Sequence, residues 1–374
     1  MKKLMVIPLV AAGMAAMVGC SKTPVKEAAK NDAINLANLD TAVAPGTDFY
    51  QYACGGWMKN NPLKPEYARF GTFDQLRDNN QEQIRTLIEG LSETPGQEGS
   101  VGQKIGMLFA MGMDSVKLNE DGYAPIKDQL AEINKLGTKD ELTKMVATLH
   151  KEGMAPFFAL YVGADEKNSS MNIVQLYQAG LGMGDRDYYL LEDESSQKMR
   201  EAYKNYITRL FTLIGSSPEQ ADAAVNAIMK IERGIAEVSF SREDLRDSQK
   251  NYNKMSIEDF KAKNDLLNWD VYFESMGMMD IKYLDAKQLS FYEGLSALMK
   301  NTTLDEQKYY LTFNLLSSAA PYLSDPFVAA DFDFYGKTMS GRQEQQPRWK
   351  RALSTVNGAP VSYTHLTLPT SDLV

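Results

Sequence analysis

Three charged side chains near the amino terminus have the types and the spacing of a binding site for an acidic group. Arg69 follows a stretch with two prolines, and Asp74 and Arg77 stand three residues apart where a helix is expected to begin. Residues three apart in a helix are neighbours on its surface, so the three side chains can converge. A guanidinium binds a carboxylate, such as the end of a peptide, through two parallel hydrogen bonds. The residues alone favour the simpler alternative, an exposed arginine beside an ordinary salt bridge.

The two histidines of the chain, His150 and His365, do not have the spacing of a catalytic metal site. A zinc peptidase needs two imidazoles one helical turn apart with a glutamate between them, the pattern HExxH, and a third ligand further along. Neither histidine begins such a pattern. His150 lies near the end of an expected helix, where a histidine has an ordinary electrostatic role. The sequence therefore predicts no catalytic residue and no metal ligand in this chain.

The first 20 residues resemble the signal peptide of a bacterial lipoprotein. Two lysines precede a short apolar run, which ends in Met-Val-Gly before Cys20. The run is too short for a convincing membrane-spanning helix, so we expect Cys20 to become the lipid-modified first residue of the mature protein. An ordinary secretory peptide with an incidental cysteine is the alternative. Only Cys54 then remains, which excludes a disulfide within the chain and leads us to expect a small buried thiol.

Composition and charge bear on the class of partner. The chain has 374 residues, 44% of them hydrophobic, and a net charge of -9. The sequence shows no basic patch to neutralise phosphates, so we expect no nucleic-acid partner. The acid–base runs at residues 185–187 and 246–247 are expected to form ion pairs that stabilise the fold. Trp349 is expected to be a core residue on a helix with a basic edge.

The elements that must position these side chains are mostly helices. Apolar residues recur near a 3.6-residue period, and serine or threonine caps mark several helix starts. Residues 156–165 and 171–178 are rich in aromatic and β-branched types and flank the turn-forming EKNSS, which predicts a β-hairpin. The expected helices begin near Phe73 and then cover residues 101–113, 124–136, 139–152, 195–214, 218–238, 269–276, 289–300, 304–323 and 347–358.

Residues 45–77 are expected to form an irregular arm that wraps another part of the protein. The segment contains four aromatic residues, a Gly55-Gly56 pair and two prolines, and it shows no sustained helical period. The glycines permit unusual backbone geometry, and the prolines keep the following stretch extended. The aromatic rings need a large surface to pack against.

This arm resembles the amino-terminal signature of the neprilysin and endothelin-converting-enzyme family of zinc metalloendopeptidases, DFYxYxxGxW followed by R-x-G-x-F-D-x-L-R. Three later stretches resemble the family in order: GLGMGDRDYYL at 180–190, LRDSQKNYN at 245–253, and FYGKTMSGRQEQQPRWKRALSTVNGA at 334–359. The resemblance covers residues 45–359. The matching positions in the arm are Asp48, Phe49, Tyr50, Tyr52, Gly55, Gly56, Trp57, Arg69, Gly71, Phe73, Asp74, Leu76 and Arg77.

The resemblance implies a mostly α-helical, multi-helix, non-catalytic domain with a small β-hairpin that ends before a thermolysin-like zinc domain. It implies that Arg69, Asp74 and Arg77 line the substrate pocket on the leaving-group side of the scissile bond. The complete family enzyme holds zinc and hydrolyses small peptides, whereas this chain lacks HExxH and is expected to bind no zinc and to be inactive alone. Expected partners are peptide substrates, the missing catalytic domain and a membrane of the bacterial cell envelope, reached through the lipid anchor and facing the periplasm or the exterior.

The last residues bear on how complete the chain is. Pro360 ends the final expected helix, and VSYTHLTLPTSDLV has no helical period and no counterpart in the family. We expect a foreign sequence joined to a truncated reading frame, with a natural short variant as the alternative. The alternative function is a non-catalytic helical lipoprotein that binds peptide or oligosaccharide for uptake. The expected domains are a signal peptide at 1–20, a flexible tether at 21–44, the arm at 45–77 that would wrap the missing catalytic domain, an incomplete helical domain covering the active-site chamber at 78–359, and the tail at 360–374.

Overall fold

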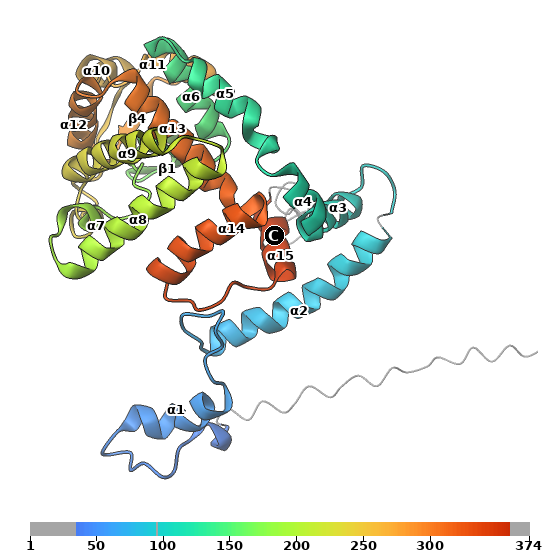
Figure 1. Ribbon diagram of the computed structural model, residues 1–374. Helices are drawn as coiled ribbons and strands as arrows, with labels where there is room; N and C mark the ends of the chain where they lie inside the picture. Colours follow the sequence, from blue (N-terminus) through green and yellow to red (C-terminus); the bar gives the residue numbers. More distant parts are fainter. Residues whose placement is uncertain (1–34, 95, 360–374) are drawn as a thin grey trace, which may run out of the picture. The chain divides into compact units, whose positions relative to one another are not determined.

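The computed structural model describes residues 35–94 and 96–359, which form a mostly helical fold with one small sheet (Figure 1). Internal contacts divide the described residues into two compact units, one that ends at Pro62 and one that begins at Leu63. The division falls inside the segment expected to be one arm. The expected signal peptide, most of the expected tether and the tail after Ala359 lie outside the described residues.

The first unit contains a helix in place of the irregular arm that the sequence predicts. A short 3₁₀-helix, η1, spans Leu36–Asn38, and α1 spans Phe49–Asn60. The side chain of Asp48 caps α1 by accepting a hydrogen bond from the N–H of Gln51 at 2.9 Å. The prediction of irregular backbone is therefore wrong for this stretch, because a local cap and contacts with η1 override the weak helical pattern.

The glycines of α1 serve close packing rather than unusual backbone geometry. A Cβ atom at Gly56 would lie 2.4 Å from the carbonyl oxygen of Ala37, so a larger residue would push α1 away from η1. Phe49 and Tyr50 are 69% and 67% exposed. Cys54 is a free thiol that is half-buried, which corrects the expectation of a buried one.

The second unit holds the remaining helices, and none of the described helices is long and apolar enough to cross a membrane. The short helices α4, α7, α10 and α14 and the π-helix η5 were missing from the sequence-based expectation. The bounds are α2 Thr72–Glu93, α3 Val101–Met113, α4 Ser115–Asp121, η2 Ala124–Ile126, α5 Lys127–Lys135, α6 Lys139–Lys151, α7 Asp187–Leu190, α8 Glu194–Leu213, α9 Pro218–Val238, η3 Asp244–Arg246, α10 Ile257–Lys263, α11 Trp269–Met276, α12 Leu289–Lys300, α13 Leu304–Ala319, η4 Ala320–Tyr322, α14 Asp325–Asp331, η5 Phe332–Met339 and α15 Arg348–Gly358.

Local capping signals account for the accuracy of the longer helix predictions. Thr138 before α6, Ser217 before α9 and Thr303 before α13 each form a capping box with the third residue of the helix. The largest difference at a helix end is at α13, which stops at Ala319 and continues only as the short turn η4. Pro321 has no N–H to donate and cannot extend the α-helical ladder, which explains the early stop.

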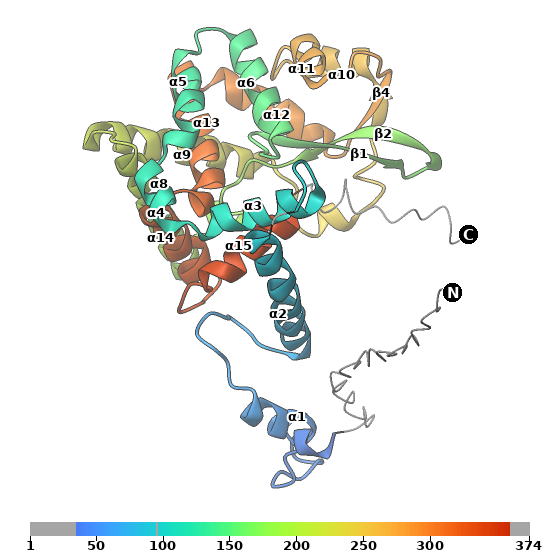
Figure 2. The ribbon, with the colours of Figure 1, turned by 90° about the vertical axis from the view of Figure 1, so that its right-hand side faces the viewer.

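The predicted hairpin is confirmed, but it belongs to a larger sheet (Figure 2). Strands β1, Phe158–Asp165, and β2, Asn168–Gln178, pair antiparallel, so the turn is shorter than EKNSS suggests. Strands β3, Lys254–Ser256, and β4, Tyr283–Ala286, complete a mixed sheet in the order β1-β2-β4-β3. Strands of three and four residues have too little alternation to be recognised from sequence, and β4 joins β2 in parallel across a long connection.

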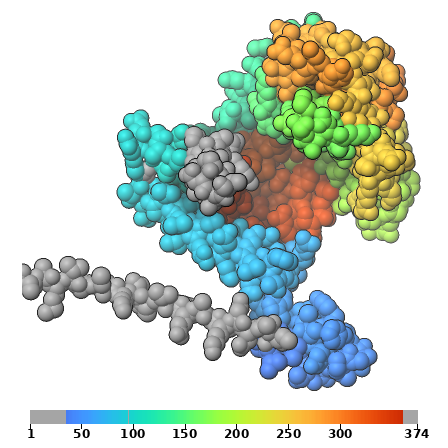
Figure 3. Space-filling view, turned by 180° about the vertical axis from the view of Figure 1, so that it is seen from behind, coloured from blue at the N-terminus to red at the C-terminus, as the bar shows by residue number. Residues whose placement is uncertain are grey.

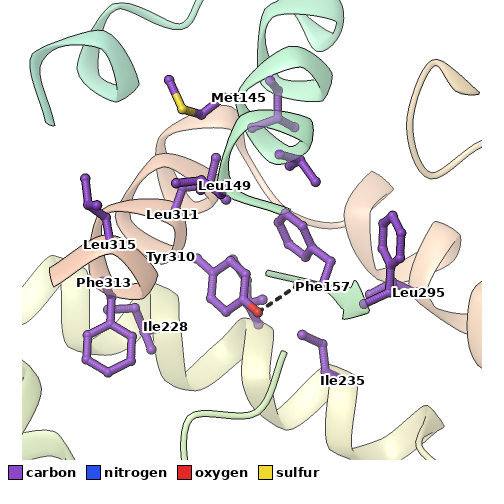
Figure 4. Packing of buried hydrophobic residues seen from close by; sticks show 14 of the residues in the cluster. Met145, Leu149, Phe157, Ile228, Ile235, Leu295, Tyr310, Leu311, Phe313 and Leu315 are labelled. Atoms are coloured by element: carbon purple, nitrogen blue, oxygen red, sulfur yellow. Dashed lines mark hydrogen bonds between the residues drawn. The ribbon is translucent and has the colours of Figure 1, made fainter. Parts of the chain in front are cut away.

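The larger core lies where α6, α9, α12 and α13 meet the sheet (Figure 4). At its centre, the N–H of the fully buried Phe157 donates to the hydroxyl of Tyr310 at 3.1 Å, and that hydroxyl donates to the carbonyl of Gly180 at 2.8 Å. Phe157 has a φ of 67°, which is strained for a bulky residue, so these contacts hold it in place. The start of β1 is thereby tied to α13 and to the glycine-rich loop that follows β2.

A second, smaller core joins α2, α3 and α15. Its buried members come from all three helices and are Ile88, Phe109, Ala352, Leu353 and Val356. These helices lie side by side in both ribbon views. Figure 3 shows a hollow on one face of the second unit, with orange and red surface of the later helices at its floor and the cyan and green surfaces of earlier segments at its borders.

Candidate functional site

The start of α2 holds two of the three side chains that the sequence singles out. Asp74 lies in the first turn, and its Oδ2 accepts a hydrogen bond at 2.9 Å from the N–H of Gly71, the residue that caps the helix. Its Oδ1 accepts a second hydrogen bond from Nη2 of Arg77 at 2.6 Å. The Asp74 side chain is 16% exposed and the Arg77 side chain 54% exposed, so the pair is open to solvent on the arginine side.

Arg69 is exposed and lies two residues before the cap of α2. Among the described residues its side chain forms no ion pair and no hydrogen bond. The structure therefore joins Asp74 to Arg77 and shows no bond between this pair and Arg69. The salt bridge is also what the simpler alternative expects, so a binding role stays a prediction. A free guanidinium keeps all five of its N–H donors available to a ligand.

A buried ion pair joins Asp78, the residue after Arg77, to Lys350 on a distant helix. Nζ of Lys350, on α15, is 2.7 Å from Oδ1 of Asp78 and 3.0 Å from the hydroxyl oxygen of Tyr67. The Tyr67 hydroxyl also donates to Oδ1 of Asp78. Lys350 is only 6% exposed and Tyr67 5%. We name these residues the Tyr67–Asp78–Lys350 cluster.

Opposing electrostatic effects keep both members of this ion pair charged. Burial by itself raises the pKa of Asp78, but hydrogen bonds from Lys350 and Tyr67 outweigh it and hold the pKa below its ordinary value. Burial by itself lowers the pKa of Lys350, but Asp78 and Tyr67 raise the pKa overall. Each charge is therefore satisfied by the other, as burial of charged groups requires.

The segment before α15 supports the cluster through the backbone. The N–H groups of Gln343 and Glu344 donate to the carbonyl of Pro65 at 2.9 and 3.0 Å. Trp349 is half-buried against the second core, and the Arg85 guanidinium lies over its ring, 4.6 Å from the ring centre. Lys350 does not lie on an exposed basic edge of α15, as the sequence predicts. It is buried and forms an ion pair with Asp78.

A cavity of about 510 Å³ lies between α9, α13, η5 and the loop after β2. Glu232 in its wall is 1% exposed, and its two carboxyl oxygens accept hydrogen bonds from the hydroxyls of Tyr189 at 2.5 Å and Tyr203 at 2.9 Å. Burial raises the pKa of Glu232 to about 8, although the tyrosine hydrogen bonds act in the opposite direction. The cavity wall thus contains a carboxyl group that is mostly protonated at neutral pH.

The glycine-rich loop GLGMGDRDYY packs onto this carboxyl group. The Tyr335 hydroxyl, on η5, donates to the carbonyl of Gly182 at 3.0 Å. A Cβ atom at Gly182 would lie 1.8 Å from the hydroxyl of Tyr203, so no larger residue fits. The loop is therefore a packing element of the larger core.

The two acid–base runs have different roles. Asp185 forms an ion pair with Arg242, from a distant part of the chain, and Arg186 donates to a main-chain carbonyl at 2.5 Å. The expected ion pair is thus present at Asp185. Among the described residues Asp247 has no ion pair; its carboxylate accepts two main-chain N–H groups at 3.0 and 3.2 Å instead. The prediction of an ion pair at Asp247 is therefore wrong, because main-chain N–H groups of the adjoining turn bind the carboxylate instead.

The electrostatic role that the sequence predicts for His150 at the end of α6 is wrong. Its Nδ1 lies 2.6 Å from the hydroxyl of Tyr272 and its Nε2 lies 3.1 Å from the carbonyl of Pro156. Burial lowers the pKa of His150 to about 4, so the ring is uncharged at neutral pH and acts through hydrogen bonds. Within residues 35–94 and 96–359, no three histidine, cysteine, aspartate or glutamate side chains lie close enough to hold a metal ion. His365 lies outside the described residues.

Sequence reasoning missed the Tyr67–Asp78–Lys350 cluster and the buried Glu232. Lys350 and Asp78 are 272 positions apart, so no local pattern links them. The one available signal is that Tyr67 and Lys350 lie in segments that resemble the family and Asp78 follows such a segment directly. Nothing in the sequence marks Glu232, which lies on α9 like any helical glutamate.

Comparisons with known proteins all lead to one family of peptidases. The sequence model described as "Peptidase family M13" matches residues 45–364. Endothelin-converting enzyme 1 of Mus musculus is 29% identical over 379 residues, which cover 94% of this chain and 48% of that protein. Neprilysin-11 of Caenorhabditis elegans is 27% identical over 339 residues, 84% of this chain and 39% of that protein.

A solved structure shows the same likeness in three dimensions. The zinc metalloprotease ZMP1 of Mycobacterium tuberculosis, in complex with an inhibitor, aligns with a TM-score of 0.82 and 26% identity. The alignment covers 91% of this chain and 53% of that one. This chain therefore spans about half the length of the relatives that it matches.

Proposed function

Because this chain belongs to peptidase family M13, we propose that it forms the amino-terminal, substrate-admitting portion of a zinc metalloendopeptidase that hydrolyses small peptides. Its own contribution is to bind the peptide and to limit which peptides enter. The observation that carries this proposal is the exposed Arg69 guanidinium, which is unpaired among the described residues and is followed within eight residues by the Asp74–Arg77 pair.

The chemistry of these side chains suits the carboxylate end of a peptide. Arg69 can donate two parallel N–H bonds to both oxygens of a carboxylate. Asp74 holds the Arg77 side chain at 2.6 Å, which orients its remaining N–H donors and restricts its motion. A peptide with a free carboxyl end is therefore preferred to one whose end is an amide.

The zinc ion of such an enzyme does not fit the described residues of this chain. Catalytic zinc takes three protein ligands, commonly imidazoles and a carboxylate. The one histidine among the described residues, His150, uses both ring nitrogens for internal hydrogen bonds, and its surroundings are aromatic. We propose that the zinc ligands and the chemical step belong to the part of the relatives that this chain does not cover.

Binding of matched peptides tests the proposal. The full 374-residue chain is titrated with a fluorescent peptide that ends in a free carboxylate and with the same peptide ending in an amide. We expect the carboxylate form to bind about tenfold more tightly, since a hydrogen bond to a charged group contributes about 1.5 kcal/mol or more. The variant Arg69→Ala should bind both peptides equally.

The matched control is Arg233→Ala, which removes an arginine with 52% exposure from a helix surface. This variant should keep the preference for the carboxylate. Equal affinities of the unaltered chain for the two peptides would defeat the proposed carboxylate site. A preference that persists in Arg69→Ala would move the site to other residues.

We also propose that the chain is a lipoprotein of the bacterial cell envelope, anchored through Cys20, which lies outside the described residues. The charged start, the short apolar run and the Gly19-Cys20 junction support this proposal. Expressed in a bacterium, the unaltered chain should partition into membranes and carry the mass of attached lipid. Cys20→Ala should lose that mass, whereas Cys54→Ala, the matched control, should keep it. Identical masses for the unaltered chain and Cys20→Ala would contradict acylation.

A further inference from the structure

We propose that Lys350 is a positioning residue for the peptide-carboxylate site, which it serves by fixing the short bridge that carries Arg69. The inference rests on the proposed function of Arg69. Lys350 is 281 positions further along the chain and does not bond to Arg69 itself. It acts through Tyr67 on one side of Arg69 and through Asp78 on α2.

The bridge is short and is held at both ends. Tyr67 at one end donates its hydroxyl to Asp78, and Gly71 at the other end donates its N–H to Asp74 at 2.9 Å. Both acceptors lie on α2, one helical turn apart. Only Ala68, Arg69 and Phe70 lie between the two attachment points, so the Cα of Arg69 has little freedom relative to the helix.

Lys350 bonds to both partners of the first attachment, Tyr67 and Asp78. Its Nζ contacts both Asp78 at 2.7 Å and the Tyr67 hydroxyl at 3.0 Å, and it lies 5.5 Å from the centre of the Tyr67 ring. Without this ammonium group, the Asp78 carboxylate would lose its closest charged partner, since Lys64 is 3.5 Å away and half exposed. The Tyr67 side chain would then keep its hydroxyl bond to Asp78 on α2 but lose its bond to α15.

A purely structural reason for this buried lysine is weak. Buried ion pairs contribute little net stability, and apolar residues of similar size often replace them without loss. The adjoining core of Leu353, Ala352 and Val356 already attaches α15 to α2 and α3 through apolar contacts. What an apolar residue at position 350 could not do is bond to Tyr67 and Asp78 at the same time. The cluster therefore fixes the position of Tyr67, and with it the segment that carries Arg69, relative to α2 and α15.

The same pair of peptides tests this inference in the full chain. Lys350→Met keeps much of the side-chain volume and removes the ammonium group, and Tyr67→Phe removes only the hydroxyl. In both variants we expect the preference for the carboxylate peptide to fall from about tenfold to about threefold or less, with affinity for the amide peptide unchanged. The matched control, Lys117→Met, removes an exposed lysine that pairs with Asp121 and should keep the full preference.

A double variant separates positioning from general damage to the fold. If Lys350 acts through Arg69, then Arg69→Ala with Lys350→Met should bind the carboxylate peptide no more weakly than Arg69→Ala alone. Additive losses, or an equal loss for both peptides, would show a merely structural role and overturn the inference. If Lys350→Met does not fold, the same two measurements are made on Tyr67→Phe, alone and combined with Arg69→Ala, and are interpreted in the same way. Absence of any preference in the unaltered chain would instead reject the proposed function, before any variant of the cluster is considered.

Discussion

At the scale of single residues, the burial of titratable groups determines their charge in this protein. Glu232 and His150 both have ordinary pKa values that would leave them charged or partly charged near neutral pH. Burial raises the pKa of Glu232 to about 8 and lowers that of His150 to about 4, so both are mostly neutral at pH 7. Asp78 is the contrasting case, since a lysine and a tyrosine keep it ionised.

Glu232 should make the stability of the protein fall as the pH rises. Its pKa is about 8 in the folded chain against 4.5 ordinarily, so between these values the folded state holds a proton that the unfolded state has released. The free energy of unfolding therefore decreases with pH in this window, by at most about 1.4 kcal/mol per pH unit from this group. Glu232→Gln cannot ionise, and its stability should lack this contribution.

Urea denaturation of the two proteins at pH 5, 6, 7 and 8 measures the effect. As the pH rises, the unfolding free energy of the unaltered chain should fall relative to that of Glu232→Gln. Glu219→Gln, an exposed glutamate on the same helix, is the control and should parallel the unaltered chain. Parallel curves for Glu232→Gln as well would show that Glu232 is ionised throughout.

At the scale of elements, α2 depends on other helices for its attachment. Of its 22 residues only Ile88 is buried, while Phe73, Leu76 and Leu87 are more than half exposed. A helix with so little burial gains little from its own sequence, because the stability of most helices comes from tertiary packing. The smaller core with α3 and α15 therefore holds the helix that carries Asp74 and Arg77.

Leu353→Ala should loosen this three-helix group. Leu353 is fully buried in the smaller core, and truncation of such a leucine costs about 2–5 kcal/mol because a cavity remains. Leu87→Ala on α2 is the control, since Leu87 is 68% exposed and its truncation should change stability by about 0.5 kcal/mol or less. Denaturant unfolding gives the magnitudes. Equal effects of the two substitutions would mean that the smaller core does not attach α2.

At the scale of the whole molecule, the chain has the fold of the amino-terminal part of family M13, with no group of metal ligands among its described residues. We expect the purified chain to show no metal-dependent hydrolysis of a quenched fluorescent peptide. Zinc titration should reveal no site tighter than about micromolar, because the affinity of zinc sites comes from several converging ligands. A full-length family member serves as the positive control. Hydrolysis that a chelator abolishes would refute this expectation.

The sequence by itself determined most of the helices, the hairpin and the family. Capping residues such as Thr138, Ser217 and Thr303 act on N–H groups three residues away, so the signal for a helix start is local. The hairpin is local as well, since its two strands are joined by a short turn. The three residues that we propose for the site, Arg69, Asp74 and Arg77, were also recognisable in the sequence, because two of them are close on one helix and the third lies just before it.

Only the tertiary structure decided which charges are buried and which short strands pair. Strand β4 joins β2 more than one hundred residues away, and Lys350 meets Asp78 across 272 positions. The neutral states of His150 and Glu232 depend in the same way on burial by other elements of the fold. Burial and ion pairing are sums over neighbours in space, and a linear sequence specifies those neighbours only once the chain has folded.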